Sequence, residues 1–392
     1  MNTLSIMRRG LRRRLVPVVT MLVVVAGCNE VSPNATKSKP ATTGRFDTGE
    51  KDGGPARPCV TDPSYYDVPN DGCDNDGDGT IDNPPVCDDG ESGDSAESFA
   101  RGMGICTKVS EVGYGLVSAK FTRGHGRDDA PQAEQHSLLE KFGDKLRPRE
   151  GKRLGVLSTG YAQEFNGAPN EPFSRGRDWY GAVPGSGGNG TAPPGFPKGA
   201  KGCPQETEVN DVVNLHLELT APKNASGFAF DFNFHSGEWP TFVCSKYNDG
   251  FIAYLNAKSY ESGRPDNISF DSLGNPVSVN NGFFDRCTPG TTLGCGSQTL
   301  GLSKCPSGPG ELAGTGFGLV GASCGAEALA TLGGATGWLF SQAPILGGET
   351  FTLDLMIWDV GDGILDSSVL LDNFRWALGE VATTTDRPAD VK

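Results

Sequence analysis

The sequence is poor in apolar and aromatic residues, and this shortage disfavours some fold classes. Only 36% of its 392 residues are hydrophobic and 8% are aromatic, whereas 56 are glycine and 27 are proline. A helical bundle is disfavoured, because chains of this composition build short strands joined by many turns, or disordered segments. The length allows one large all-β domain with appendages.

Basic charge, zinc-type spacings and catalytic motifs are scarce as well. The chain has 34 basic and 48 acidic residues, so it lacks the positive surface that a nucleic-acid partner requires. It contains no C-x2-C pair and only four scattered histidines, which argues against zinc. An H-E-x-x-H sequence is also missing, and we therefore do not expect an enzyme.

The N-terminus has the pattern of an export signal. Arginines between residues 8 and 14 precede an apolar run over residues 15–26 that is too short to span a bilayer. The run ends in V-A-G-C, which resembles a bacterial lipobox and predicts that Cys28 is acylated once residues 1–27 are removed. A plain secretory signal is the alternative. The next residue is Asn29, which favours an exported protein held at the outer membrane or cell surface by its lipid alone.

The cysteine count becomes even once Cys28 is assigned to lipid. The remaining thiols would lie in an oxidising compartment, where disulfides are expected. They form a block of four and a block of six, each of which can close on itself, and the sequence leaves the pairing within each block open. The residues are Cys59, Cys73, Cys87 and Cys106, then Cys203, Cys244, Cys287, Cys295, Cys305 and Cys324.

Composition divides the chain into regions. Residues 29–58 have almost no apolar side chains and predict a disordered, flexible tether. Short helices are expected at 95–104 and 133–142, and a long Gly/Pro/Asn/Ser loop at 166–202. The expected regions are a lipoprotein signal peptide (1–27), the tether (28–58), a Cys-containing acidic segment (59–110), an extension with the long loop (111–207), a β-sandwich (208–378) and a polar tail (379–392).

From residue 211 onward, apolar and polar residues alternate with a period of two. The clearest cases are V-N-L-H-L-E-L at 213–219 and F-A-F-D-F-N-F at 228–234, where the phenylalanines share one face. Several such strands without interleaved long helices predict an all-β fold, an antiparallel β-sandwich of jelly-roll type with small helical additions. Further strands are expected at 251–256, 314–320, 337–340, 351–358 and 368–376.

The strongest chemical motif is D-N-D-G-D-G-T-I-D at residues 74–82. Carboxylates at loop positions 1, 3, 5 and 9 can surround a hard cation, the glycine at position 6 allows a sharp bend, and the isoleucine at position 8 would pack as an apolar anchor. The predicted calcium ligands are Asp74, Asp76, Asp78, Thr80 and Asp82.

This D-x-D-x-D-G motif resembles the loops of thrombospondin type 3 and related bacterial repeats, which implies a structural role for the metal. It departs from a complete EF-hand loop at position 12, where Pro85 replaces the bidentate glutamate. Asp88 or Asp89 could take that place. A solvated acidic linker without metal is the alternative.

The region from about 208 to 376 resembles the choice-of-anchor L domain, which occurs on secreted and surface proteins of bacteria. The upstream residues 154–160 look like the extension that accompanies this domain in lipoproteins of the myxobacterial type. The resemblance implies a fold and an extracellular location more than an activity. The matching blocks, in order, are 228–242 (F-A-F-D-F-N-F-H-S-G-E-W-P-T-F), 247–251 (Y-N-D-G-F), 267–270, 276–282, 333–338 and 357–374.

A second acidic set lies where strands are expected to end. Neighbouring glycines would let its carboxylates converge on a second metal ion, although capping of turns is the alternative and the spacing is looser than in the first motif. The set consists of Glu238, Asp249, Asp359, Asp362 and Asp366. His235 is expected to be a satisfied surface histidine. Trp239, Trp338, Trp358 and Trp376 are expected to pack in the core or an interface rather than to stack on sugars.

Three function classes remain open. The leading prediction is a non-catalytic, lipid-anchored and calcium-stabilised surface protein, which binds a glycan, matrix or protein partner or takes part in adhesion. The second is a structural envelope component without a soluble ligand. The third is a glycoside hydrolase-like enzyme that would use a carboxyl pair such as Glu238 and Asp249, and it requires a pocket that joins the two groups.

Overall fold

The computed structural model describes residues 59–88, 93, 95–163, 190–294, 299–318, 320–322, 329–331 and 333–388. The expected signal peptide and tether, Cys28, Cys295 and Cys324 lie outside these residues, as does most of the loop expected at 166–202. None of the described helices is both long and apolar enough to cross a membrane.

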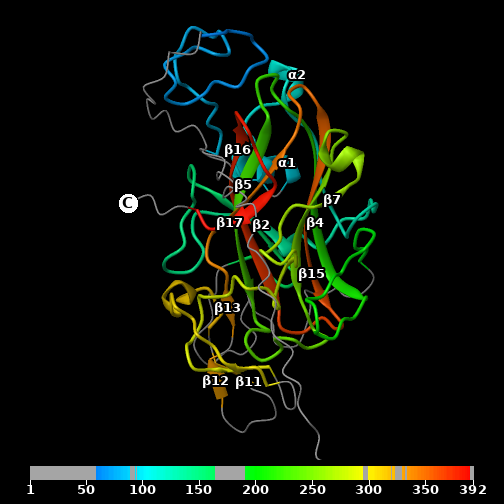
Figure 1. Ribbon diagram of the computed structural model, residues 1–392. Helices are drawn as coiled ribbons and strands as arrows, with labels where there is room; N and C mark the ends of the chain where they lie inside the picture. The colour runs from blue at the N-terminus through cyan, green and yellow to red at the C-terminus, as the bar shows by residue number, and fades with distance from the viewer. Residues whose placement is uncertain are drawn as a thin grey trace, which may run out of the picture. The chain divides into compact units, whose positions relative to one another are not determined.

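The described chain forms two antiparallel sheets that face each other (Figure 1). The first sheet has the order β1-β4-β15-β6-β7, and β8 also pairs with β6. All of its pairings are antiparallel. Its strands are β1 (Gly115–Thr122), β4 (Val209–Thr220), β6 (Gly250–Asn256), β7 (Asp266–Asn267), β8 (Val277–Ser278) and β15 (Thr350–Val360).

The second sheet has the order β17-β14-β5-β16-β3-β2, and β13 pairs with β5. Its pairings are antiparallel as well. Its strands are β2 (His136–Leu139), β3 (Leu154–Ser158), β5 (Gly227–Ser236), β13 (Gly334–Ala335), β14 (Leu339–Pro344), β16 (Ser367–Ala377) and β17 (Thr384–Asp386). Because β4, β5, β6, β14, β15 and β16 alternate between the sheets, the connections cross the sandwich as in a jelly roll.

Short elements surround the sandwich. The helices are α1 (Ala96–Gly102) and α2 (Val109–Val112), with 3-10 turns η1 (Ala133–Gln135), η2 (Tyr260–Gly263) and η4 (Gly310–Leu312). Two small ribbons pair β9 (Thr292–Leu293) with β10 (Gly301–Leu302), and β11 (Val320–Ala322) with β12 (Leu329–Thr331).

The core lies between the sheets and is built from the alternating residues that the sequence indicates. The phenylalanines at 228, 230, 232 and 234 are all buried. Phe228 of the second sheet stacks on Phe351 of the first, with ring centroids 5.3 Å apart. The rings of Phe232 and Phe251 also meet across the sheets in a tilted arrangement, with centroids 5.1 Å apart. These contacts across the interior confirm the predicted antiparallel sandwich and its apolar face.

Two local predictions are confirmed and two are wrong. α1 begins at its Ser95 N-cap, whose hydroxyl accepts a hydrogen bond from the Ser98 N–H. The strands expected at 213–219, 228–234, 251–256, 351–358 and 368–376 also form.

The helix expected at 133–142 is instead η1 followed by β2. The two leucines of β2, Leu138 and Leu139, pack into different apolar clusters, as they must on a strand, because neighbouring side chains point to opposite sheet faces. A helix would have placed both on one face.

The strand expected at 314–320 is also absent, and most of this segment forms turns. Gly314, Gly316 and Gly318 adopt positive φ values of 74, 85 and 85°. The alternation of glycine with larger residues therefore reflects repeated left-handed turns rather than a strand.

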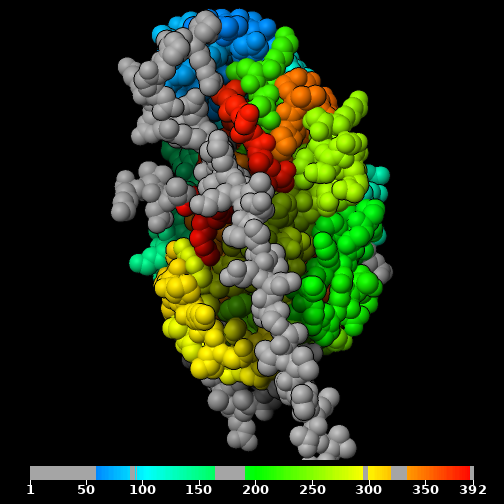
Figure 2. Space-filling model, viewed as in Figure 1, coloured from blue at the N-terminus to red at the C-terminus, as the bar shows by residue number. Residues whose placement is uncertain are grey.

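Residues 59–88 form an irregular segment against one end of the sandwich (Figure 2, blue). The Lys223 N–H donates to the Ser64 carbonyl (3.1 Å), the Tyr66 N–H donates to Asn224 Oδ1 (2.9 Å), and Asn224 Nδ2 donates back to the Tyr66 carbonyl (2.8 Å). The loop that follows β4 thus holds the acidic segment in place.

Candidate metal centre

The acidic loop brings Asp74, Asp76 and Asp78 together. One carboxylate oxygen from each lies within 4.8 Å of the others, and no other group of three His, Cys, Asp or Glu residues in the described chain meets this distance. Oxygen donors at this spacing suit a hard cation such as calcium. The sequence motif therefore predicts a real cluster of side chains.

Backbone donors hold the loop in its bend. The N–H groups of Gly77 and Gly79 donate to the two oxygens of Asp74 at 2.7 and 3.1 Å, and both glycines have positive φ. Asp78 accepts from the Thr80 N–H (2.7 Å) and from Asn83 Nδ2 (3.0 Å), and these bonds lower the pKa of its carboxyl. Partial burial beside like charges raises the pKa of Asp76. The carboxylates are thus oriented without a cationic side chain among them.

Three residues of the motif do not take their expected places. Asp82 lies outside the cluster, and its Oδ1 accepts from the Gly72 N–H at 3.0 Å. Ile81 is 58% exposed, so it does not pack as an apolar anchor. Asp88 faces the sandwich, where the backbone N–H groups of Lys152 and Arg153 donate to it, and it does not replace a ligand at Pro85. Asp89 lies outside the described residues.

Four disulfides tie the described chain. They are Cys59–Cys73, Cys87–Cys106, Cys203–Cys244 and Cys287–Cys305. The first block of cysteines closes on itself, and its two bridges flank the acidic loop. This resolves the pairing that the sequence left open in the first block.

The second acidic set is brought together but is buried. The exposure of Glu238, Asp249, Asp359 and Asp366 is 2% or less, whereas Asp362 lies at the rim and is partly exposed. The Asp249 N–H donates to Glu238 Oε2 (3.3 Å), and the Asp249 carboxyl accepts from the Val360 N–H (3.1 Å) and the Ser367 hydroxyl (2.8 Å).

Burial dominates the electrostatics of this set. It raises the pKa of Glu238 and Asp359, and it raises the pKa of Asp249 to about 7. Repulsion from neighbouring carboxylates acts in the same direction.

Sequence reasoning missed Asp211, which joins this buried set. It lies in β4, where the pairing with β15 shifts register between Ile357 and Asp359, and its φ is +51°. Such a bulge turns a side chain away from its regular face. The alternation of β4 shows no sign of the bulge, so the sequence offers no signal for this residue.

The prediction for His235 is wrong. Its side chain is fully buried in β5, between the rings of Phe142 and Phe317 at centroid distances of 5.3 and 5.4 Å. Neither ring nitrogen has a hydrogen-bond partner among the described residues. Burial lowers the pKa of His235 to about 3, so the imidazole is neutral.

The tryptophans are mostly internal. Trp239, Trp358 and Trp376 are buried, and Trp338 is half-buried with the guanidinium of Arg149 6.0 Å from its ring. Three of the four therefore pack in the core as expected and present no open platform to a sugar.

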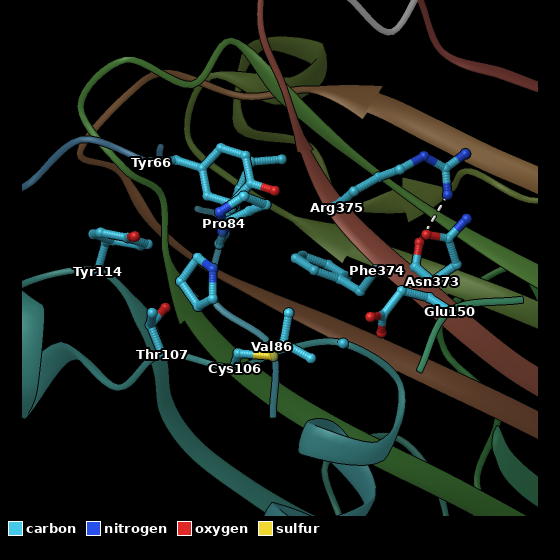
Figure 3. Close-up of a pocket in the computed structure, with 13 residues that line it drawn as sticks. Tyr66, Pro84, Val86, Cys106, Thr107, Tyr114, Glu150, Asn373, Phe374 and Arg375 are labelled. Carbon is cyan, nitrogen blue, oxygen red and sulfur yellow. Dashed lines mark hydrogen bonds between the residues drawn. The ribbon is translucent and has the colours of Figure 1, made fainter. Parts of the chain in front are cut away.

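A cavity of about 120 Å³ lies between the acidic segment and β16 (Figure 3). Tyr66 and Tyr114 line one side, and Phe374 lines another next to Glu150 and Arg375. Burial raises the pKa of Tyr66 to about 12, so its phenol stays protonated and can donate a hydrogen bond. The cavity combines aromatic faces with one acidic and one basic group.

Comparison with known proteins places the sandwich in a family. No curated protein and no solved structure matches the chain. The model of the choice-of-anchor L domain matches residues 155–374, which include most of β3, all of β4 and the greater part of β16, and the match begins upstream of residue 208. This domain suggests a cell-surface protein, and the four disulfides are consistent with export. Since the match covers more than half of its length, the chain belongs to the choice-of-anchor L family.

Proposed function

We propose that this chain is a lipid-anchored surface protein whose β-sandwich binds a glycan, matrix or protein partner without catalysing a reaction. Calcium at Asp74, Asp76 and Asp78 stiffens the segment that completes the binding cavity. The observation that carries this proposal is the cavity itself, because one of its walls belongs to the acidic segment and the other to the sandwich.

The calcium site supports binding by fixing one wall of the cavity. The Asp74 loop and the cavity residues Pro84 and Pro85 belong to the same segment, which Cys59–Cys73 and Cys87–Cys106 tie at its ends. Neutralising three neighbouring carboxylates would stabilise the loop, because their mutual repulsion is removed. Weak affinity suffices at extracellular calcium concentrations.

The cavity has the chemistry of a recognition site. Aromatic rings pack on the apolar faces of sugars or on peptide side chains, and the charged residues Glu150 and Arg375 also line the cavity. Its volume admits one small group, such as part of a sugar ring or a single side chain. We therefore expect it to hold the tip of a larger partner.

The carboxyl pair considered for glycoside hydrolysis argues for a non-catalytic protein. Glu238 and Asp249 are buried, and both already accept hydrogen bonds from neighbouring protein groups. Neither residue lines the cavity between the acidic segment and β16. A substrate there could not reach them.

A glycan and matrix array, probed with the full chain in calcium and in chelator, tests the proposed function. We expect binding that requires calcium and is lost in the double variant Asp74→Asn, Asp76→Asn. Asp128→Asn, a change at an exposed carboxylate paired with Lys120, serves as the control and should bind normally. If the wild-type chain binds no array component under either condition, the binding function is wrong and a structural envelope component is favoured.

The lipid anchor is tested separately. Cys28→Ala should abolish acyl labelling and move the protein from the detergent phase to the aqueous phase. Unchanged labelling and partitioning in this variant would contradict the lipoprotein assignment and favour a plain secretory signal. Fractionation of the outer membrane then tests the localisation.

A further inference from the structure

Buried carboxylates converge where several strands of both sheets end. Asp359 lies near the end of β15, Asp366 immediately precedes β16, and Asp249 immediately precedes β6. The bulge of β4 adds Asp211, and Glu238 follows β5 closely. All five are nearly inaccessible to solvent.

No cationic side chain of the described chain forms an ion pair with Glu238, Asp249 or Asp359. Within the acidic set, Lys246 acts on Asp362 at the rim, and its Nζ also lies 3.9 Å from a carboxylate oxygen of Glu206 outside the set.

Two buried carboxylates elsewhere in the described chain do have ion-pair partners. Asp231 pairs with Arg149 and Arg375. Asp354 likewise contacts the imidazoles of His125 and His216. Buried Asp67 and Asp372 have no cationic partner among the described residues either, but both accept hydrogen bonds from backbone N–H groups. What distinguishes this cluster is Asp359, whose oxygens have no such donor among the described residues.

Asp359 is the least satisfied member of the cluster. Both of its carboxylate oxygens are buried and have no hydrogen-bond partner among the described residues. The nearby Thr159 hydroxyl donates to the Ser367 carbonyl (3.4 Å), and its effect on the Asp359 carboxyl is outweighed by burial, which raises the pKa of Asp359. The charged groups that act on Asp359 are the carboxylates of Asp249, Asp211 and Asp366. A bare carboxylate that faces other carboxylates in the protein interior is strongly unfavourable unless a cation or protons balance it.

We infer that the Asp359 carboxylate is a ligand of a divalent cation, held with the carboxylates of Asp249, Asp211 and Asp366 around it. The donors are all oxygens, which select a hard cation, and their irregular arrangement suits calcium better than the strict octahedron of magnesium. No three of these side chains bring oxygens within 4.8 Å of one another. Two of the carboxylates at most therefore bind the ion directly in this arrangement, the others balance its charge, and neutral oxygens complete the coordination.

Glycines leave room for these carboxylates. A Cβ at Gly160 would overlap the Asp366 carboxylate, and a Cβ at Gly363 would overlap the carboxylate of Asp211. The cation would join β4, β6, β15 and β16 at one end of the sandwich. Its expected role is therefore to stabilise the fold, and this inference does not rest on the proposed function.

Shared protons are the competing explanation, since burial alone can keep carboxyls neutral. The two explanations differ in an observable way, because a bound cation displaces protons and can be counted. The loop at Asp74 would bind calcium too, so the count must be made in the variant Asp74→Asn, Asp76→Asn, called here the loop variant.

The experiment is equilibrium dialysis of the full detergent-extracted chain against calcium alone, followed by elemental analysis. We expect about one calcium ion per chain in the loop variant. Adding Asp359→Asn to the loop variant should weaken that binding at least about tenfold and remove the rise in melting temperature that calcium causes. The control is Asp354→Asn in the same background, a buried carboxylate of the same strand outside the cluster, which should retain the ion.

Two results would overturn the inference. One is a loop variant that holds no calcium or magnesium after dialysis against millimolar calcium. This result does not depend on a change at Asp359, so it decides the question even if Asp359→Asn does not fold. The other is a folded Asp359→Asn chain that keeps the ion. Loss of calcium binding at the Asp74 loop alone would instead contradict the proposed function and leave this site standing.

Discussion

The Ser367 hydroxyl donates a hydrogen bond to Asp249 Oδ2 across 2.8 Å and so joins the two sheets of the sandwich. Ser367 begins β16 in the second sheet, whereas Asp249 immediately precedes β6 in the first. Both residues are buried, and Asp249 Oδ1 accepts from the Val360 N–H at the end of β15 (3.1 Å). One carboxyl therefore connects three strand ends, and its donors determine how those ends are held.

Ser367→Ala is expected to lower the free energy of unfolding by about 1–3 kcal/mol, because a buried carboxyl oxygen loses its donor. The matched control is Ser368→Ala, which removes a buried 2.9 Å bond to the Ser158 hydroxyl and should cost less. Urea denaturation of both variants measures the difference. Equal losses would show that the bond to Asp249 has no special weight.

His235 is expected to make the protein sensitive to acid. Its pKa is about 3 in the folded state and about 6.5 when exposed, so the unfolded chain binds the extra proton between these values. The stability that the neutral imidazole confers is therefore present above pH 6.5 and is lost as the pH falls toward 3. Between about pH 7 and pH 4 this residue should cost roughly 3 kcal/mol.

The variant His235→Leu isolates that contribution, because leucine fits an apolar site and does not titrate. The difference in unfolding free energy between wild type and variant should grow as the pH falls. Phe230→Leu, at a buried residue of the same strand that does not titrate, is the control and should lose the same free energy at every pH. A difference for His235→Leu that does not change with pH would contradict the burial of a neutral imidazole.

Much of the sandwich follows from local sequence, and the failures have physical causes. β5 was predictable because apolar side chains alternate along it without interruption, and β15 because its alternation continues into the apolar residues Met356, Ile357 and Trp358. β1 and β3 lie in the upstream extension and were not predicted. They form strands because they pair with segments far along the chain, β1 with β4 and β3 with β16. No local pattern contains that information.

The residues of the candidate sites were likewise predictable only in part. The Asp74 cluster is contiguous, so spacing alone identifies Asp74, Asp76 and Asp78, but spacing cannot show that Asp82 accepts from Gly72 instead. Glu238 and Asp359 were recognisable as acids at strand ends, whereas their burial was not. The cavity walls come from segments far apart in the chain, and only the fold brings them together.

Gly155→Ala is expected to destabilise the protein by about 1–3 kcal/mol, because a Cβ there would overlap the buried ring of Phe99 in α1. The double variant Gly155→Ala, Phe99→Leu should recover part of the loss, since the smaller side chain frees space. Gly282→Ala is the control, because a Cβ at Gly282 meets no atom within 4 Å. Denaturant titrations measure the free energy of unfolding of each variant. Equal losses for Gly155→Ala and Gly282→Ala would contradict the close approach of α1 and β3.

The Cys87–Cys106 disulfide is expected to hold the acidic segment on the sandwich. The bridge spans 19 residues, and Val86 and Cys106 line the cavity. Replacing both cysteines by serine should lower the free energy of unfolding by about 3 kcal/mol, because the unfolded chain regains freedom.

That change should also expose residues 59–88 to limited proteolysis, since one end of the segment is released. The control is the double replacement of Cys203 and Cys244 by serine, which removes a bridge of 41 residues elsewhere in the chain. It should destabilise the protein globally and leave 59–88 protected while the sandwich stays folded. If residues 59–88 resist cleavage equally in both variants, the contacts of Tyr66 with Asn224 are sufficient to hold the segment, and the disulfide only adds stability.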